Sequence, residues 1–183
     1  GVAAPSANRF GHVSPTTADA VIEELGDYLS KDDLVLDGGA CDVGVESAII
    51  DCTGAAPSVL RPGAISIAMI EECTGLKTTQ SDTEVRVSGS LQNHYAPNAK
   101  VYLTETPIAG QGLIAYATIE TPSGVIRLAS PQNDEEFAQI LYSALRDADA
   151  KGLKEVVVYQ PIGNGIGVAI RDRLSKANKG RPF

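Results

Sequence analysis

The stretch "DEEFAQILYSALRDADAKGLKEVVVY", residues 134–159, decides the fold class of this chain. Its apolar residues recur at helical spacing on one face, which consists of Phe137, Ile140, Leu141, Ala144, Leu145 and Ala148. This pattern predicts one helix over residues 134–150, with Gly152 as its stop signal. The β-prone run "EVVVY" at 155–159 then predicts a strand. A helix that leads directly into a buried strand is the repeating unit of α/β folds.

The same alternation continues on both sides of this stretch. Upstream, three short runs are typical of strands, at 100–104, 112–117 and 124–130. Downstream, apolar spacing predicts a last helix over about 166–178. Strands with intervening helices predict a small α/β domain over residues 99–183 with a partly parallel sheet.

Residues 1–75 have the pattern of a second α/β unit. Ser14 and Pro15 are good residues for a helix start, and the apolar spacing that follows predicts a helix over 15–29. Strands are expected at 34–39, 46–51 and 58–61, and a short closing helix at 65–73. The polar residues 76–98 lack sustained periodicity, which is typical of a linker or a long ordered loop.

Composition narrows the class of protein further. With 183 residues and 43% hydrophobic content the chain can build a core, and no apolar run approaches the roughly 20 residues that a membrane span needs. The net charge of -8 argues against general attraction to nucleic acid. Three cysteines without a paired spacing argue against disulfides and zinc, so we expect Cys41, Cys52 and Cys73 to be reduced, buried thiols in the cytoplasm.

The glycine-rich segment and the two histidines give little support for a nucleotide, metal or triad site. "GNGIG" at 163–167 has Val168 where a dinucleotide fingerprint needs its third glycine, so a glycine-rich turn is favoured over a nucleotide site. His12 and His94 are the only histidines, and neither has the neighbours of a triad or a metal site. In "NHYAP", residues 93–97, the residues support equally a lid over a ligand and a tyrosine that fixes the linker to a domain surface.

Short hydrogen-bonding side chains gather near the first predicted helix. Ser6, Asn8 and Ser14 precede its amino end, where unpaired amides and the helix dipole favour anions such as phosphates. Further along, Ser47 adjoins a strand and Arg61 precedes a turn, where its planar fork of donors suits phosphate or carboxylate. Each feature alone is typical of turn chemistry, but their joint order and spacing point to a ligand site.

Four ordered motifs carry a resemblance to a known family. They are "APSANRFGHVSPT" (4–16), "LDGGACDVGVESAIID" (36–51), "LRPGAIS" (60–66) and "HYAP" (94–97). The chain resembles the two-domain threonylcarbamoyl-AMP synthases, whose catalytic part is a YrdC-like domain. The resemblance implies the carboxy-terminal part of a YrdC-like twisted α/β sheet domain over 1–75, a linker over 76–98, and a small Rossmann-like α/β domain over 99–183.

The resemblance also implies a reaction. L-threonine, bicarbonate or carbon dioxide, and ATP would yield threonylcarbamoyl-AMP and pyrophosphate, which makes the enzyme a nucleotidyltransferase. Partner proteins would then transfer the threonylcarbamoyl group to adenosine 37 of tRNA. Magnesium is expected with the triphosphate, and the cytoplasm is the expected location, without a membrane.

Site residues follow from the resemblance position by position. ATP and the adenylate would contact Ser6, Asn8, Ser14, Arg61 and Tyr95, the last closing over the nucleotide from the linker. The Ala4 backbone and Ser47 would hold L-threonine. No covalent nucleophile and no protein metal ligand is expected, because adenylation can proceed by positioning and electrostatics.

Two departures from the family pattern matter. Ala48 stands where the family usually has threonine, so a hydroxyl near the bound L-threonine is lost. The family's lysine-x-arginine strand has no counterpart except Lys179-Gly180-Arg181 in the tail, which we interpret as chance. We therefore expect a piece of a longer synthase that makes no threonylcarbamoyl-AMP alone.

A second hypothesis is a non-catalytic module that binds a nucleotide or RNA, with weak binding of double-stranded RNA. The last helix and tail offer a small basic patch, formed by Arg171, Arg173, Lys176, Lys179 and Arg181. A solvated helix face explains this patch equally well.

Overall fold

Two separate sheets organise the chain, which is described by a computed structural model over residues 1, 6–80, 87–89 and 94–180. The larger sheet has the order β4-β7-β5-β6, and its three neighbouring pairs are all parallel. Its strands are β4 (Lys100–Tyr102), β5 (Gly112–Ile114), β6 (Ile126–Ala129) and β7 (Glu155–Val158). The predicted α/β class is therefore confirmed, with a sheet that is parallel throughout.

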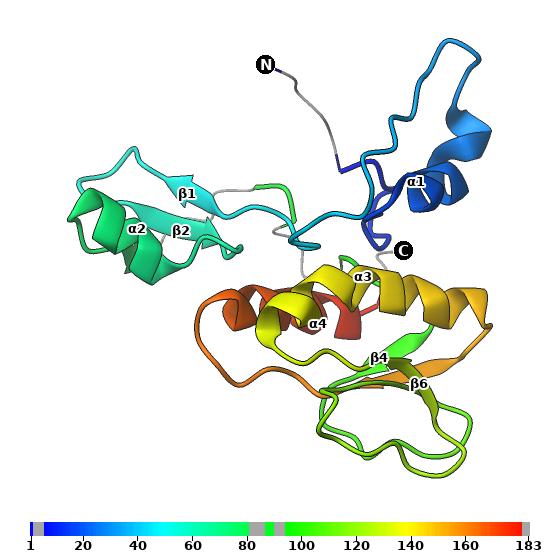
Figure 1. The fold of residues 1–183 in the computed structure, drawn as a ribbon. Coiled ribbons are helices and arrows are strands. Elements are labelled where there is room, and N and C mark those ends of the chain that lie inside the picture. Colours follow the sequence, from blue (N-terminus) through cyan, green and yellow to red (C-terminus); the bar gives the residue numbers. More distant parts are fainter. Residues whose placement is uncertain (2–5, 81–86, 90–93, 181–183) are drawn as a thin grey trace.

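Both long helices lie on one face of this sheet (Figure 1). They are α3 (Asp134–Ala150) and α4 (Ile166–Asn178), with the bounds that the apolar spacing predicts. Asn133 caps α3, because its side-chain oxygen accepts a hydrogen bond of 2.8 Å from the Glu136 amide. Acidic residues in the first turn complement the dipole of α3.

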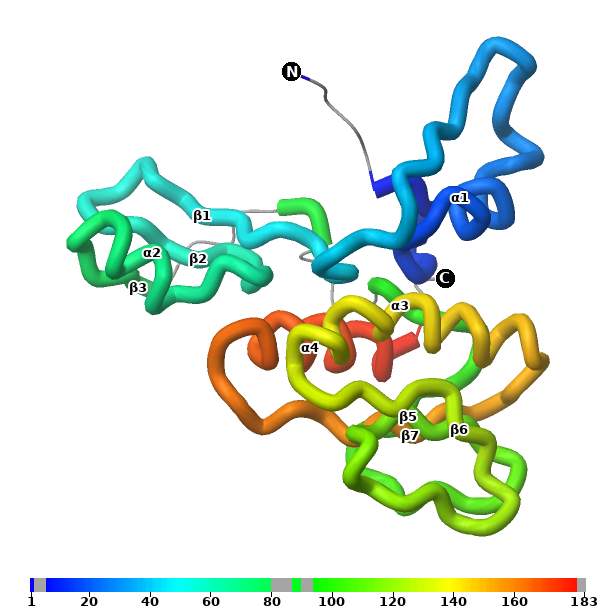
Figure 2. The backbone as a smooth tube through the Cα atoms, in the orientation of Figure 1, coloured from blue at the N-terminus to red at the C-terminus, as the bar shows by residue number. Residues whose placement is uncertain are grey.

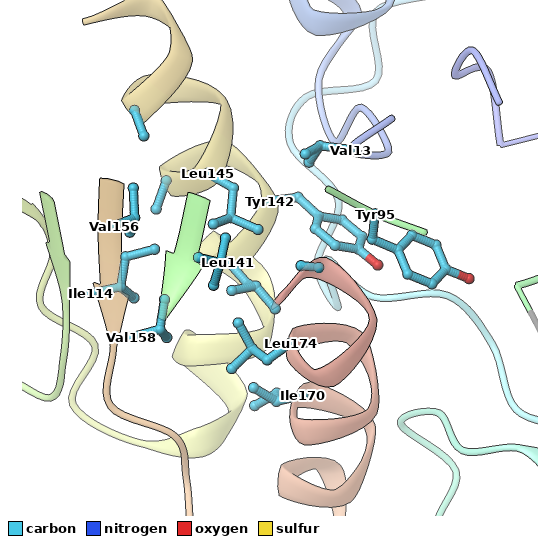
Figure 3. Close-up of a cluster of buried hydrophobic side chains, with 14 of the residues drawn as sticks. Val13, Tyr95, Ile114, Leu141, Tyr142, Leu145, Val156, Val158, Ile170 and Leu174 are labelled. Atoms are coloured by element: carbon cyan, nitrogen blue, oxygen red, sulfur yellow. The ribbon is translucent and has the colours of Figure 1, made fainter. Parts of the chain in front are cut away.

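The main core fills the space between these helices and the sheet (Figure 3). Aliphatic side chains of the strands meet those of α3 and α4, namely Val101, Ile114, Val156, Val158, Leu141, Leu145, Ile170 and Leu174, all 1% exposed or less. Full burial of one such side chain contributes about 1.5–3 kcal/mol. A smaller cluster around Leu113, Ala115 and Val157 covers the other face.

The smaller sheet has the order β1-β2-β3 and carries helix α2. Strand β1 (Ile49–Asp51) pairs antiparallel with β2 (Ser58–Arg61), and β3 (Thr79–Gln80) pairs parallel with β2. Helix α2 (Ile67–Thr74) begins after Ser66, whose side chain accepts from the Met69 amide. The expected strand at 58–61 and the expected helix at 65–73 are found, whereas the strand expected at 46–51 is shorter.

Residues 6–48 form an arm that passes over α3 (Figure 2). Its helix α1 (Ala18–Leu25) continues as a short 3-10 turn, η1 (Gly26–Tyr28). The predicted start at Ser14 is wrong, because the Thr17 side chain caps the helix and the Ser14 hydroxyl bonds elsewhere. The apolar spacing also predicts that Ile22 faces inward, but Ile22 is 52% exposed and Glu24 is buried instead.

Two further expectations for the arm and its neighbourhood fail. The predicted strand at 34–39 is irregular, and Leu34 and Leu36 are 79% and 81% exposed. An apolar run forms a strand only where a partner strand accepts its backbone, and none of the described residues pairs with this segment. The three cysteines are free, as expected, but all three are exposed rather than buried.

Candidate functional site

The arm is fixed to α3 through the buried carboxylate of Glu24. Arg9 Nε lies 3.0 Å from Glu24 Oε1, and Arg146 Nη1, from α3, lies 3.1 Å from Oε2. Burial would raise the pKa of the Glu24 carboxyl, but the hydrogen bonds from Arg9 and Arg146 hold it below its ordinary value. Arg146 also donates to the carbonyls of Val13 and Ala20. The loop before α1 is therefore held at both its ends.

A second carboxylate, that of the partly buried Glu46, joins the arm to both helices of the larger unit. Its Oε1 accepts from the Ser14 hydroxyl at 2.7 Å, and its Oε2 accepts from Tyr142 and from Arg173 Nε, both at 2.8 Å. Burial would raise the pKa of the Glu46 carboxyl, but the hydrogen bond and charge of Arg173 and the Ser14 hydroxyl hold it low. Glu46 is therefore an anion at neutral pH.

Arg61 and Ser47 meet beside this carboxylate. Arg61 is 8% exposed and comes from the end of β2. Its Nε donates to the Ser47 carbonyl at 3.1 Å, its Nη1 to the Ser88 carbonyl at 2.9 Å, and its Nη2 lies 3.5 Å from Ser47 Oγ. One guanidinium thus connects β2, the loop before β1 and the segment before "NHYAP".

Tyr95 packs onto the larger unit at the same place. Its ring stacks on Tyr142 with centroids 5.7 Å apart, and the Arg173 guanidinium lies 5.4 Å from its centroid. Figure 3 shows the two tyrosine rings side by side at one end of the core. Tyr95 is 2% exposed and has a φ of 59°, which is uncommon for a residue other than glycine. Burial raises the pKa of its hydroxyl, so the phenol is neutral at pH 7.

Four of the predicted site residues are therefore linked through Glu46 and its neighbours. Ser14 bonds the Glu46 carboxylate, and Tyr95 stacks on Tyr142, which bonds the same carboxylate. Arg61 bonds Ser47, the residue that follows Glu46. Ser6 is exposed, and Ala4 lies outside the described residues. Asn8 donates from Nδ2 to the carbonyls of Arg9 and His12, while its buried Oδ1 has no partner within the described part of the chain.

Sequence reasoning missed Glu46, Tyr142 and Arg173. A usable signal existed for Arg173, because it occupies the apolar stripe of α4 together with Ile170, Leu174 and Ala177. A charged residue at such a position is buried with a partner. The identity of that partner, 127 residues away in the sequence, follows only from the fold.

The basic patch of the last helix is largely occupied by internal contacts. Arg173 is 1% exposed, Lys176 pairs with Asp172 at 2.7 Å, and Arg171 donates to the carbonyls of Pro161 and Gly163. Arg181 lies outside the described residues. The second hypothesis, of an RNA-binding module, therefore loses much of the surface on which it depends.

Local geometry explains the glycine-rich segment. Gly165, with a φ of 66°, is the N-cap of α4, so "GNGIG" forms the turn into that helix. Across the described residues, no three His, Cys, Asp or Glu side chains converge as a metal site. No helix in the described part of the chain is long and apolar enough to cross a membrane.

These features define a class: an α/β protein in which an arm and a small sheet are joined to a parallel-sheet unit through the contacts of Glu24, Glu46 and Arg61. Residues 65–178 match the family model described as threonylcarbamoyl-AMP synthase, C-terminal domain, and residues 1–63 match the model described as telomere recombination. The chain belongs to the threonylcarbamoyl-AMP synthase family, and the resemblance drawn from the four motifs is confirmed.

Named relatives agree with this assignment. The threonylcarbamoyl-AMP synthase of Pyrococcus abyssi is 34% identical over 97% of this chain and 57% of its own length. The Bacillus subtilis protein of the same name is 33% identical over 98% and 58%. The crystal structure of P. abyssi Sua5 complexed with L-threonine matches with a TM-score of 0.77 and 29% identity, over 96% of this chain and 57% of that one. The chain thus spans little more than half the length of the relatives it matches.

Proposed function

We propose that this chain provides part of the active site of an L-threonylcarbamoyladenylate synthase. The observation that carries the proposal is that residues of four separate motifs are linked in one network. Arg61 bonds Ser47, Ser14 bonds Glu46, and Tyr95 stacks on Tyr142, which also bonds Glu46. A relative with a matching fold has been solved in complex with L-threonine, which supports the amino acid as substrate.

The residue types suit the reaction. Adenylate formation needs reactants held in alignment and charge neutralised on the phosphates, and it does not need a protein nucleophile. Ser47 offers a hydroxyl for L-threonine, and Arg61 offers donors for the phosphates of ATP. Ser6, Asn8, Ser14 and Tyr95 would contact the nucleotide, and the Ala4 backbone the threonine.

The remaining substrates and partners belong to the same proposal. Bicarbonate supplies the carbamoyl carbon, and the product serves tRNA modification through partner proteins. Magnesium would be held chiefly by the triphosphate, since Mg²⁺ commonly takes substrate phosphates and few protein ligands. The three free cysteines fit a reducing cytoplasm.

Pyrophosphate release tests the proposal. The chain is assayed with ATP, L-threonine and bicarbonate, alone and together with the part of the P. abyssi synthase that it does not match. We expect release only in the mixture, and we expect Arg61→Ala to lower it by about tenfold or more, since a charge-assisted contact is worth about 1.5–3 kcal/mol.

Arg171→Ala is the matched control, because the Arg171 side chain donates to the carbonyls of Pro161 and Gly163, in the loop before α4. Circular dichroism confirms that both variants are folded. Equal losses in the two variants would contradict the role of Arg61, and the absence of L-threonine-dependent release from the mixture would contradict the function itself.

A further inference from the structure

Arg173 belongs to α4 in the larger unit, yet its contacts lie mainly in the arm. Its side chain is fully buried and donates from Nε to Glu46 Oε2 at 2.8 Å and from Nη2 to the Glu46 carbonyl at 3.2 Å. Its Nη1 pairs with Asp172 at 2.6 Å. The guanidinium therefore holds both the side chain and the backbone of Glu46.

The next residue along the chain is Ser47, which the proposed function assigns to L-threonine. Two arginines hold consecutive carbonyls here: Arg173 bonds that of Glu46, and Arg61 bonds that of Ser47. Each carbonyl belongs to a rigid peptide plane, and these two planes flank the Ser47 Cα. Fixing both planes restricts φ and ψ of Ser47, and therefore the direction of its Cα–Cβ bond. The side-chain torsion then places the hydroxyl, which lies 3.5 Å from Arg61 Nη2.

Neighbouring contacts reinforce the position of Glu46 and of the Arg173 guanidinium. Tyr142 donates to the Glu46 oxygen that Arg173 also holds, and Arg173 lies over the ring of Tyr95. Gly44 allows the close approach, because a Cβ there would lie 2.4 Å from the Ala138 carbonyl of α3. The α3–α4 pair is thus a rigid support for one wall of the site.

We propose that Arg173 is a positioning residue for Ser47, through which the carboxy-terminal α/β unit sets the geometry of the threonine end of the site. The effect of this positioning on the reaction rests on the proposed function. It gives the small α/β unit a role in the reaction without contact between that unit and the reacting atoms.

Arg173→Lys is the informative variant, and Arg171→Lys is its control. A lysine keeps the charge beside Glu46 but cannot make the planar fork that reaches carboxylate and carbonyl together. Arg171 lies two residues away on the same helix and bonds only the carbonyls of Pro161 and Gly163 in the described structure. The two substitutions are chemically identical.

Two readouts are measured on the whole chain: the backbone NMR order parameter of Ser47 and the affinity for L-threonine. In Arg173→Lys we expect the order parameter to fall from about 0.85 toward 0.6. We expect the affinity for L-threonine to fall about tenfold, the cost of one charge-assisted hydrogen bond. Arg171→Lys should leave both within about twofold.

The outcomes separate the inference from the proposed function. An unchanged order parameter of Ser47 in Arg173→Lys overturns the inference, whether or not the affinity falls. If the wild-type chain binds no L-threonine even with the complementary part of the P. abyssi synthase, the proposed function fails, and the order parameter still decides the positioning role.

A second variant covers the case in which Arg173→Lys does not fold. Tyr142→Phe removes only the hydroxyl that donates to Glu46 and keeps the ring stacked on Tyr95. We expect the same changes on a smaller scale, with an affinity loss of about threefold. A wild-type order parameter in Tyr142→Phe would then overturn the inference.

Discussion

At the scale of single residues, the chain depends on a few buried charges that are fully paired. Glu46 and Arg173 are the clearest case, since the carboxylate has three hydrogen-bond donors and the guanidinium has no exposed surface. Such a pair gains little over an apolar contact, because both charges must lose their water. Removing one partner is different, because it leaves a charge buried without compensation, which costs about 3–5 kcal/mol.

Glu46→Gln should therefore destabilise the chain in a pH-dependent way. The folded state holds the pKa of Glu46 low, so its stabilisation is complete above the unfolded pKa of about 4.3 and is lost as the pH falls through the folded pKa. Glutamine imitates the protonated form. We expect the variant to be about 3 kcal/mol less stable at pH 7, and the difference to shrink below about pH 4.

Urea denaturation at pH 7 and pH 3.5 measures this difference. Glu23→Gln is the control, because its carboxylate is 71% exposed and a surface change costs about 0.5 kcal/mol or less. A stability difference for Glu46→Gln that is the same at both pH values would show that the ionised carboxylate does not stabilise the fold.

At the scale of elements, the sequence predicts what depends on local pattern. Helices α3 and α4 match their predicted bounds, because each buries a continuous stripe that is legible in the sequence. The segment 34–39 has an equally clear strand pattern but forms none. Its pattern requires a partner strand, and the partner is not a property of the segment itself.

The candidate site divides in the same way. The motifs single out Ser14, Ser47 and Arg61, whose ligand contacts stay a prediction, and Ser14 bonds Glu46 where it was expected to cap α1. The contact between Arg173 and Glu46 could not be predicted, because it joins residues 127 positions apart. Long-range pairs of this kind depend on how finished elements pack.

One packing contact between elements can be tested with a pair of glycines. Gly44 and Gly152 both have a positive φ, of 74° and 66°, so alanine is strained at either position. A Cβ on Gly44 would lie 2.4 Å from the Ala138 carbonyl and 2.5 Å from the Gln139 Cα, whereas a Cβ on Gly152 meets nothing within 4 Å.

Gly44→Ala should therefore cost more than Gly152→Ala. The backbone strain of about 1–2 kcal/mol is common to both, and the collision with α3 adds about 1–3 kcal/mol for Gly44→Ala. Urea denaturation of the two variants gives the difference directly. Equal losses would mean that the loop before Glu46 can move away from α3 without cost.

At the scale of the whole molecule, the parallel-sheet unit and the arm are stabilised by different interactions. The parallel sheet and its two helices enclose their own core, to which the described residues of the arm and linker add the buried side chains of Val13 and Tyr95. The arm has few buried apolar residues and relies on the Glu24 and Glu46 ion pairs. The larger unit should therefore fold alone, whereas the arm needs the larger unit.

Arg173→Met tests this division, because its effect should depend on what surrounds the residue. In the whole chain the substitution leaves the Glu46 carboxylate buried without its partner, so we expect a loss of about 3–5 kcal/mol in the transition that exposes the arm. In a fragment of residues 94–183, Glu46 is absent, and we expect the freed side of the Arg173 guanidinium to face water while its contact with Asp172 remains. There the same substitution should change stability by about 0.5 kcal/mol or less. Urea denaturation followed by circular dichroism measures both, and a large loss in the fragment would show that Arg173 serves the larger unit itself.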